Sequence, residues 1–339
     1  MKSFLYFVCG LLITSLLGLN ACTNTNVGTT PSPSATQSSS ASSPESKHSG
    51  SHAKKININD AILSELDKLE AKLGVPALSN KIQGSRPYGK PEELVSKKVI
   101  DQAQYDQIKD MVTIEKIELT GEAKDVDYMT KLGLMKGHLL VAKELLDLKK
   151  PDQAEPHIGH PVEEIYADVE EQLNERKVPE FKTPLIALHD LVKAGGKDTA
   201  KITTEFAASV KSVDNAIAIL PATQKTSSKF VLQIINGLLD TANSEYGAAI
   251  ANGKIAEVVE YQDSRGFVVY ANELYKTIEP QLKKDNPATA TMMGKSLADL
   301  AKVWPAAIPP ATPVKTPEEV TKMVKAIEAE AQKASKPAV

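Results

Sequence analysis

Three histidines and two glutamates between residues 138 and 164 have the residue types and the spacing of a metal site. The phrase LGLMKGHLLVAKELLDL places His138 in the middle of an apolar helical stripe, and AEPHIGHPVEEIY adds His157, His160, Glu163 and Glu164 about one loop later. Because that loop and the next helix would fold back against the first helix, these imidazoles and carboxylates could supply three or four ligands to Zn, Fe or Cu.

A metal site is one of two interpretations of these histidines. A histidine on an apolar helix face is usually a core residue, hydrogen-bonded to a backbone carbonyl, and a loop such as PHIGHP can use imidazoles to satisfy its own backbone. His-x-x-His has no third ligand fixed by spacing, and the chain lacks the HExxH motif of a zinc protease. Both interpretations stay open at this point.

A second polar phrase, EVVEYQDSRGFVVYANELY, covers residues 257–275. Helical spacing places Gln262 and Gly266 on an apolar stripe, with Glu260, Asp263 and Arg265 beside it. Glycine inside a helix costs about 1 kcal/mol relative to alanine, so close helix packing or a ligand should explain Gly266. We expect the polar side chains of this phrase to pair with each other between helices.

The sequence shows no constellation typical of catalysis. The chain has two cysteines, Cys9 and Cys22, both near its start, so cysteine catalysis is excluded from the remainder. No nucleophile–base pair, matched carboxylate dyad or nucleotide-binding glycine loop stands out. We therefore expect a protein that is not an enzyme.

The elements that must position the histidines are helical. An antiparallel α-helical bundle is expected over residues 123–335, without strand-like alternation, and the breaks fall at proline and glycine clusters such as KKPDQAEPHIGHP. The periodicity predicts helices over 124–149, 161–177, 183–194, 198–219, 227–251, 254–282, 287–303 and 317–334.

The start of the chain predicts export. Residues 1–21 read as a signal peptide, and Leu19-Asn20-Ala21-Cys22 resembles a bacterial lipobox, which implies cleavage before Cys22 and lipid on its sulfur. An ordinary secretory signal is the alternative. Thr23 follows the cysteine where an inner-membrane retention aspartate would stand, which favours the outer membrane and exposure to the periplasm or the exterior. Residues 22–53, rich in Ser, Thr and Pro, predict a disordered tether.

A small helical module is expected over residues 54–115. Asn59 is a good N-cap for a helix with apolar residues at three- and four-residue spacing, and Gly74 is a good C-terminal residue for it. The phrases KININDA, LGVPALSNKIQGSRPY and YDQIKDMV resemble the ComEA-type helix-hairpin-helix domain of exported proteins. The resemblance implies non-specific DNA binding through hairpin amides at a helix N-terminus, with Gly74, Val75, Ser79, Lys81 and Arg86 nearest the phosphate.

This chain departs from the ComEA pattern at important positions. Pro76 replaces the second hairpin glycine and removes an amide donor, and Val99-Ile100 stands where the second hairpin expects a glycine turn. Ten basic and nine acidic residues make the segment 54–110 nearly neutral, and the whole chain carries a charge of −3. Neither attracts a polyanion strongly.

Two functional hypotheses follow. The first is an envelope-anchored lipoprotein whose helix-hairpin-helix module binds DNA or another polyanion, with the membrane reached through the lipid anchor. The alternative is a non-enzymatic bundle that binds metal through its histidines and glutamates, or an envelope protein partner, with the module as a scaffold only.

Overall fold

The computed structural model describes residues 55–116 and 118–334. The expected signal peptide, the lipidation site Cys22 and the tether over 22–53 lie outside the described residues. The helices described below belong to one unit of the chain, His52–Val339.

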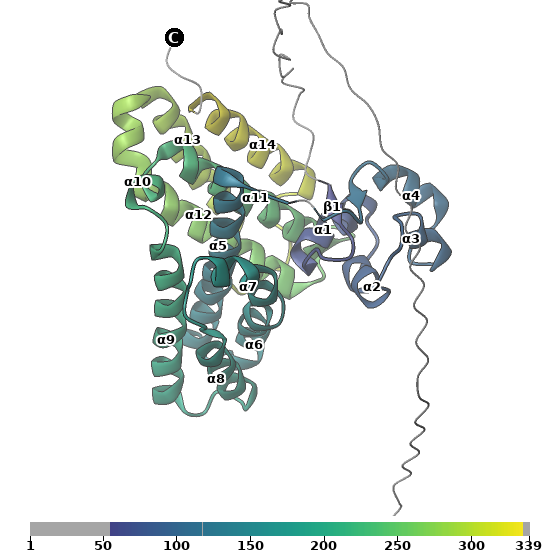
Figure 1. Cartoon of the computed structure of the whole chain (residues 1–339), viewed down its shortest axis with the longest axis horizontal. Helices are drawn as coiled ribbons and strands as arrows, with labels where there is room; N and C mark the ends of the chain where they lie inside the picture. Colours follow the sequence, from purple (N-terminus) through teal and green to yellow (C-terminus); the bar gives the residue numbers. More distant parts are fainter. Residues whose placement is uncertain (1–54, 117, 335–339) are drawn as a thin grey trace, which may run out of the picture. The chain divides into compact units, whose positions relative to one another are not determined.

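Three long helices form the centre of the bundle: α5 (Gly121–Asp147), α11 (Ser228–Ala249) and α12 (Val258–Asp285). Each of them packs against the other two, as Figure 1 shows. The helices α11 and α12 run antiparallel because β3 (Ile250–Ala251) and β4 (Lys254–Ile255) form a hairpin between them. Asn252 and Gly253 have positive φ values of 52° and 69°, as a tight hairpin turn requires.

The remaining helices cover this centre from two directions. On one side, α13 (Pro287–Ala301) and α14 (Pro317–Ala334) pack against α12 and α11 respectively and against each other. The intervening helices pack mainly on α5 and on one another, and they are α6 (Pro151–His160), η1 (Pro161–Ile165), α7 (Tyr166–Glu175), α8 (Lys182–Lys193) and α9 (Thr199–Ala218). The short α10 (Ala222–Lys225) packs on α11.

The N-terminal module, residues 55–116, has its own core. It contains α1 (Leu63–Leu73), α2 (Leu78–Gly84), α3 (Glu93–Ser96) and α4 (Gln102–Ile108), and the parallel pair β1 (Ile56–Asn57) and β2 (Val112–Thr113) joins its ends. Gly74 ends α1 in the left-handed conformation, with φ 63°. The helix α1 also packs on α11, and Ile62 at its start belongs to the core of the bundle.

A close crossing of two helices fixes the middle of the bundle. A Cβ atom added to Gly266 on α12 would lie 2.2 Å from the carbonyl oxygen of Gly137 on α5, so only glycine fits there. This crossing explains Gly266 by close backbone packing rather than by a ligand. It also sets the distance between His138, which follows Gly137, and the polar residues that precede Gly266.

The all-α fold class is confirmed, and most expected helices lie where the periodicity places them. The expected break at KKPDQAEPHIGHP is wrong, because residues 151–160 form α6. Pro151 is tolerated in the first turn, where amide hydrogens have no partner within the helix. Pro161 begins a π-helical turn in which the Tyr166 amide donates to the Pro161 carbonyl, and α7 follows directly.

Candidate metal centre

Ligand atoms of three buried or half-buried residues converge between α5, α6 and α12. One atom each from His138, His160 and Asp263 lies within 4.8 Å of the others. His138 comes from the middle of α5, His160 from the last residue of α6, and Asp263 from the second turn of α12. Two imidazoles and one carboxylate are a donor set that first-row transition metals accept.

His138 is the least satisfied polar side chain of this group. Its side chain is 1% exposed, and its Nδ1 lies 2.6 Å from Asp263 Oδ1, but the contact lacks hydrogen-bond geometry. Within the described part of the chain, neither ring nitrogen has a hydrogen-bond partner. Buried polar atoms in folded proteins nearly always have such a partner. The nitrogen and the carboxylate oxygen would have to move slightly apart to bind one cation together.

His157 has a different role in the same cluster. Its Nδ1 contacts Asp263 Oδ1 at 2.6 Å, and its Nε2 contacts Gln262 Oε1 at 2.8 Å. The Gln262 amide nitrogen donates to the Ala307 carbonyl at 3.1 Å, which turns the amide oxygen towards the histidine. Both nitrogens of His157 are therefore used by protein acceptors. The expectation that His157 is itself a metal ligand does not agree with this geometry; His157 orients Asp263 instead.

Burial and the shared carboxylate set the protonation of the centre. Burial lowers the pKa of His138, and Asp263 opposes that effect only in part. Burial alone would raise the pKa of Asp263, but the positive charges that His138 and His157 carry when protonated, and their contacts with the carboxylate, lower it well below its usual value. An ionised carboxylate can bind a cation, and each imidazole must lose its proton to do so.

Of the three candidate ligands, His160 lies nearest to solvent. Its side chain is 32% exposed, and its Nδ1 lies 3.3 Å from Asp263 Oδ2. Burial would lower the pKa of His160, but the bond to Asp263 and the charges of Asp263, Glu164 and Glu260 outweigh it and raise this pKa to about 9. A cation must therefore displace a proton from His160 at neutral pH.

A polar frame holds Asp263 and the α5–α12 crossing in place. Arg265 on α12 donates from Nε to Glu144 Oε2 on α5 at 2.8 Å, and Glu144 also accepts the Ala307 amide at 3.1 Å. Trp304 Nε1 donates to Ser264 Oγ at 2.6 Å. Much of the polar phrase at 257–275 thus pairs between helices, as the sequence predicts, while Asp263 also faces the histidines.

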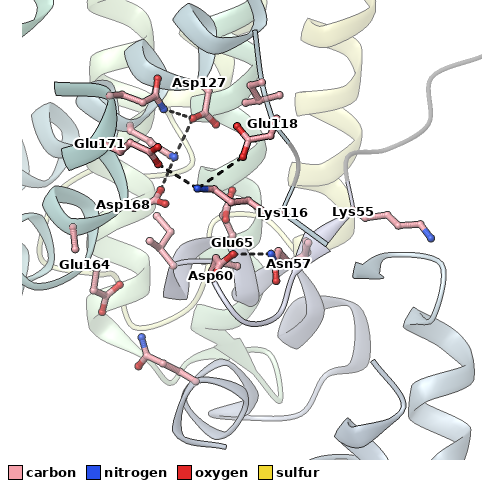
Figure 2. A pocket seen from close by; sticks show the side chains of 18 of the residues that line it. Lys55, Asn57, Asp60, Glu65, Lys116, Glu118, Asp127, Glu164, Asp168 and Glu171 are labelled. Atoms are coloured by element: carbon pink, nitrogen blue, oxygen red, sulfur yellow. Dashed lines mark hydrogen bonds and ion pairs between the residues drawn. The ribbon is translucent and has the colours of Figure 1, made fainter. Parts of the chain in front are cut away.

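The two glutamates after His160 lie beside the three ligands rather than among them. Glu163 is exposed, and Glu164 is half-buried. Both line a groove of about 600 Å³ between α7 and the start of the N-terminal module. Figure 2 shows Glu164, Asp168 and Glu171 along one wall of this groove, with Asp60 and Glu65 of the module facing them.

The residues expected to contact DNA lie at a hairpin whose donors are already in use. The amides of Ala77 and Ser79 donate to the Glu70 carboxylate at 2.9 and 3.2 Å, where a phosphate would have to bind. The Ser79 hydroxyl donates to Glu70, at 3.1 Å, and to Asp67. A phosphate here would meet two carboxylates instead of free amides.

The other expected DNA contacts are also unavailable or isolated. Arg86 donates to the backbone carbonyls of Ile58 and Ala61. Its guanidinium therefore stabilises the module and is not free to bind a phosphate. The Gly74 amide donates to the Glu70 carbonyl, and Val75 packs against the core of the module. Gly74 and Lys81 are exposed, and of these two only Lys81 carries a charge.

Sequence reasoning missed Asp263 as a candidate ligand. The phrase YQDSRG inside an apolar helix was the available signal, since an aspartate beside a buried glycine in a helix interior needs a partner. Its partner histidines lie more than 100 positions earlier in the chain, and only the α5–α12 crossing brings them together.

Residues 221–338 match the family model of the iron permease-associated 4-helix bundle domain. No curated protein and no solved structure matches the chain. Asp263 and the helices α11 to α14 lie inside the matched segment, whereas His138 and His160 precede it. The match supports a connection with metal in general terms, and it supports a membrane-associated location. Across residues 55–116 and 118–334, none of the helices combines the length and apolar character needed to cross a membrane.

The match corrects three expectations. The recognition of a ComEA-type protein is wrong, because the family that matches is the iron permease-associated bundle domain. DNA binding as the main function is wrong for the same reason, and the Glu70 carboxylate at the hairpin gives the physical cause. The lipoprotein assignment also conflicts with the match. What this chain resembles, over its last third, is an iron permease-associated 4-helix bundle domain.

Proposed function

We propose that this protein is a non-enzymatic metal-binding protein of the cell envelope that passes a transition-metal cation, foremost iron, to a permease. His138, His160 and Asp263 hold the cation as cargo, and the permease is the envelope partner. The N-terminal module serves as a scaffold that covers one side of the bundle.

One observation carries this proposal. Both ring nitrogens of His138 are buried without a hydrogen-bond partner in the described residues, and Nδ1 lies 2.6 Å from an ionised carboxylate oxygen. Leaving a buried polar group unsatisfied costs about 1–3 kcal/mol. A bound cation would remove this penalty, because it would coordinate the His138 nitrogen and the Asp263 oxygen at the same time.

The donor set favours iron among the candidate metals. Two histidines and one carboxylate that leave coordination positions open are typical of non-haem Fe(II) sites, and zinc accepts the same ligands. A soft thiolate donor, which copper(I) would prefer, is not part of the cluster. The family match to an iron permease-associated domain also favours iron.

Metal titration of the full chain tests the proposal. Metal-free protein is titrated with Fe(II) without oxygen, and with Zn(II) and Cu(II), and bound metal is measured by mass spectrometry after gel filtration. We expect one Fe(II) per chain. Asp263→Asn should release it, because a neutral amide is a poor ligand, while Asp299→Asn on the exposed part of α13 should retain it.

Two results would contradict the proposal. One is that none of the three metals stays bound in a defined ratio. The other is that Asp263→Asn binds as tightly as the unmodified chain, which would make the cluster a structural one.

A further inference from the structure

Gln262 lies behind His157, and its side-chain amide has a fixed orientation. The residue is buried in the second turn of α12, directly before Asp263. Its amide nitrogen donates to the Ala307 carbonyl at 3.1 Å and to Gln153 Oε1 on α6 at 3.2 Å. Because a backbone carbonyl can only accept a hydrogen bond, the Gln262 nitrogen must face Ala307, and the Gln262 oxygen must face His157.

This orientation determines the hydrogen bonds of His157. Its Nε2 lies 2.8 Å from the Gln262 oxygen and must donate to it, because an amide oxygen carries no hydrogen. Its Nδ1 lies 2.6 Å from Asp263 Oδ1 and faces an acceptor as well. The ring is fully buried and is held at both nitrogens, so it keeps Oδ1 of Asp263 in a hydrogen bond.

The two oxygens of Asp263 are therefore not equivalent. Oδ1 lies 2.6 Å from His157 Nδ1 and 2.6 Å from His138 Nδ1. Oδ2 lies 3.3 Å from His160 Nδ1, which is a looser contact. A hydrogen bond to an ionised carboxylate oxygen lowers the affinity of that oxygen for a proton, and it lowers the affinity for a cation in the same way. Oδ2 is thus the stronger candidate ligand of the two.

The backbone segment that orients Gln262 is itself held by both central helices. The Ala307 amide donates to Glu144 on α5 at 3.1 Å, and the Tyr261 hydroxyl on α12 donates to the Ala306 carbonyl at 3.3 Å. Ala307 is also fully buried. Because the Ala307 carbonyl cannot follow a turning side chain, Gln262 is a rigid support for His157.

Resting on the proposed metal-binding function, we propose that Gln262 is a positioning residue that makes Asp263 bind metal through one oxygen. Gln262 holds His157, and His157 keeps Oδ1 in a hydrogen bond. The other oxygen, Oδ2, binds the cation together with His138 and His160. A carboxylate that used both oxygens would fill one more coordination position. The position left open is where a receiving ligand can enter, as release of a cargo metal requires.

Infrared spectroscopy of the unmodified chain tests the one-oxygen mode without any substitution. The spectrum of metal-free protein is subtracted from that of protein with one equivalent of Zn(II), and bound zinc is measured on the same sample. Labelling of aspartate carboxyl groups with a heavy carbon isotope assigns the bands. The antisymmetric and symmetric carboxylate stretching bands lie far apart in one-oxygen binding and closer together in two-oxygen binding. We expect the wide separation.

A pair of glutamine variants tests the role of Gln262. Gln262→Met keeps the length of the side chain but removes the acceptor of His157 Nε2. We expect it to weaken Zn(II) binding about 10–100-fold and to narrow the band separation, because His157 is then free to leave Oδ1. The matched control is Gln172→Met, which should change neither quantity. Gln172 is also buried, but its amide donates to Asp127, outside the candidate centre, at 2.8 Å.

The outcomes distinguish this inference from the function on which it rests. If Zn(II) binds and the unmodified chain shows the narrow separation, Asp263 uses both oxygens and the inference alone is wrong; this comparison stands even if Gln262→Met does not fold. Weaker binding by Gln262→Met with an unchanged separation would mean that Gln262 supports only the fold, and unchanged binding would mean that it has no role. If none of Fe(II), Zn(II) and Cu(II) stays bound, the proposed function fails and the inference fails with it.

Discussion

Two buried polar clusters in this protein differ in how their atoms are satisfied. In the N-terminal module, the acid cluster of Asp67, Glu70 and Ser79 uses its oxygens to accept from two amides and a hydroxyl. In the bundle, the candidate metal centre of His138, His160 and Asp263 leaves both nitrogens of His138 without a hydrogen-bond partner in the described residues. His138 and Asp263 are buried, as the three residues of the acid cluster are, so burial alone does not mark a binding site.

The difference teaches which cluster is structural. A buried polar group whose partners are all within the protein stabilises one conformation and has nothing left to offer a ligand. The acid cluster is of this kind, since Glu70 accepts the hydrogen bonds of the hairpin amides that a bound anion would otherwise accept. In the candidate metal centre, the His138 nitrogens have no such hydrogen bonds, and a cation could bind them together with the carboxylate.

Removing His138 should have the largest effect. His138→Ala is expected to lower Fe(II) affinity more than about 100-fold, because losing even a residue that only supports a metal ligand costs about 10–100-fold. Affinity is measured by oxygen-free titration. The matched control is His189→Ala, since His189 is also buried but its Nε2 contacts Glu155 at 2.6 Å. If His138→Ala and His189→Ala bound Fe(II) with equal affinity, the cluster around His138 would be structural, as the acid cluster is.

We expect titration of Asp67 in the acid cluster to make the free energy of unfolding depend on pH. Burial, with the charges of Glu70 and Glu260, raises the pKa of Asp67 to about 7, although Ser79 and Glu245 oppose this by hydrogen bonding. The folded chain then holds a proton that the unfolded chain releases near pH 3.8. Its stabilising contribution is complete below that pH and is lost as the pH rises to about 7, by at most about 4 kcal/mol.

Asp67→Asn removes this titration and tests the assignment. Urea unfolding between pH 4 and 7 should give a flatter dependence for the variant than for the unmodified chain. Glu170→Gln, at an exposed position on α7, should keep the original slope. An unchanged slope in Asp67→Asn would mean that another group carries the dependence.

Gly266→Ala should disturb the metal centre through the backbone. The added Cβ would meet the Gly137 carbonyl, and the helices α5 and α12 would have to separate, which we expect to cost about 3 kcal/mol of unfolding free energy and to weaken Fe(II) binding. Gly84→Ala is the control, because no atom lies within 4 Å of its added Cβ. Unfolding and metal titration on the same samples decide the outcome; unaffected metal binding in Gly266→Ala would show that the crossing does not position His138.

Glu70→Ala tests whether the acid cluster affects stability without affecting metal binding. It leaves the Ala77 and Ser79 amides without their acceptor, which is expected to lower stability by about 2 kcal/mol without changing Fe(II) affinity. The exposed Glu170→Ala should change neither quantity. A loss of metal affinity in Glu70→Ala would show that the two clusters are coupled.

Local patterns predicted much of the fold. Apolar spacing placed the long helices, and Gly74 ends α1 as its sequence suggests. Asn59 does not cap α1, which begins at Leu63; its side chain instead bonds the backbone of Tyr88, 29 residues away. A local pattern cannot reveal such a distant partner.

The candidate centre was predictable only in part. His138 and His160 stood out because histidine is rare in this chain, and the spacing alone could not separate ligand from structural roles. The role of His157 depends on Gln262, and the ligand Asp263 depends on the glycine crossing. Both roles depend on tertiary packing. In the sequence alone, Gln262 and Asp263 are visible only as polar residues within an apolar helix.

The π-turn of η1 makes the length of its segment a constraint. Tyr166 bonds back five residues to Pro161, so this turn holds one residue more than an α-helical turn would. Each residue advances a helix by about 100°, and a single deletion between 161 and 165 would straighten the helix while rotating the buried Tyr166 and Val169 out of the core. Single substitutions in this segment leave the register of the helix unchanged. A change in its length would displace either His160 before it or the packed residues Tyr166 and Val169 after it.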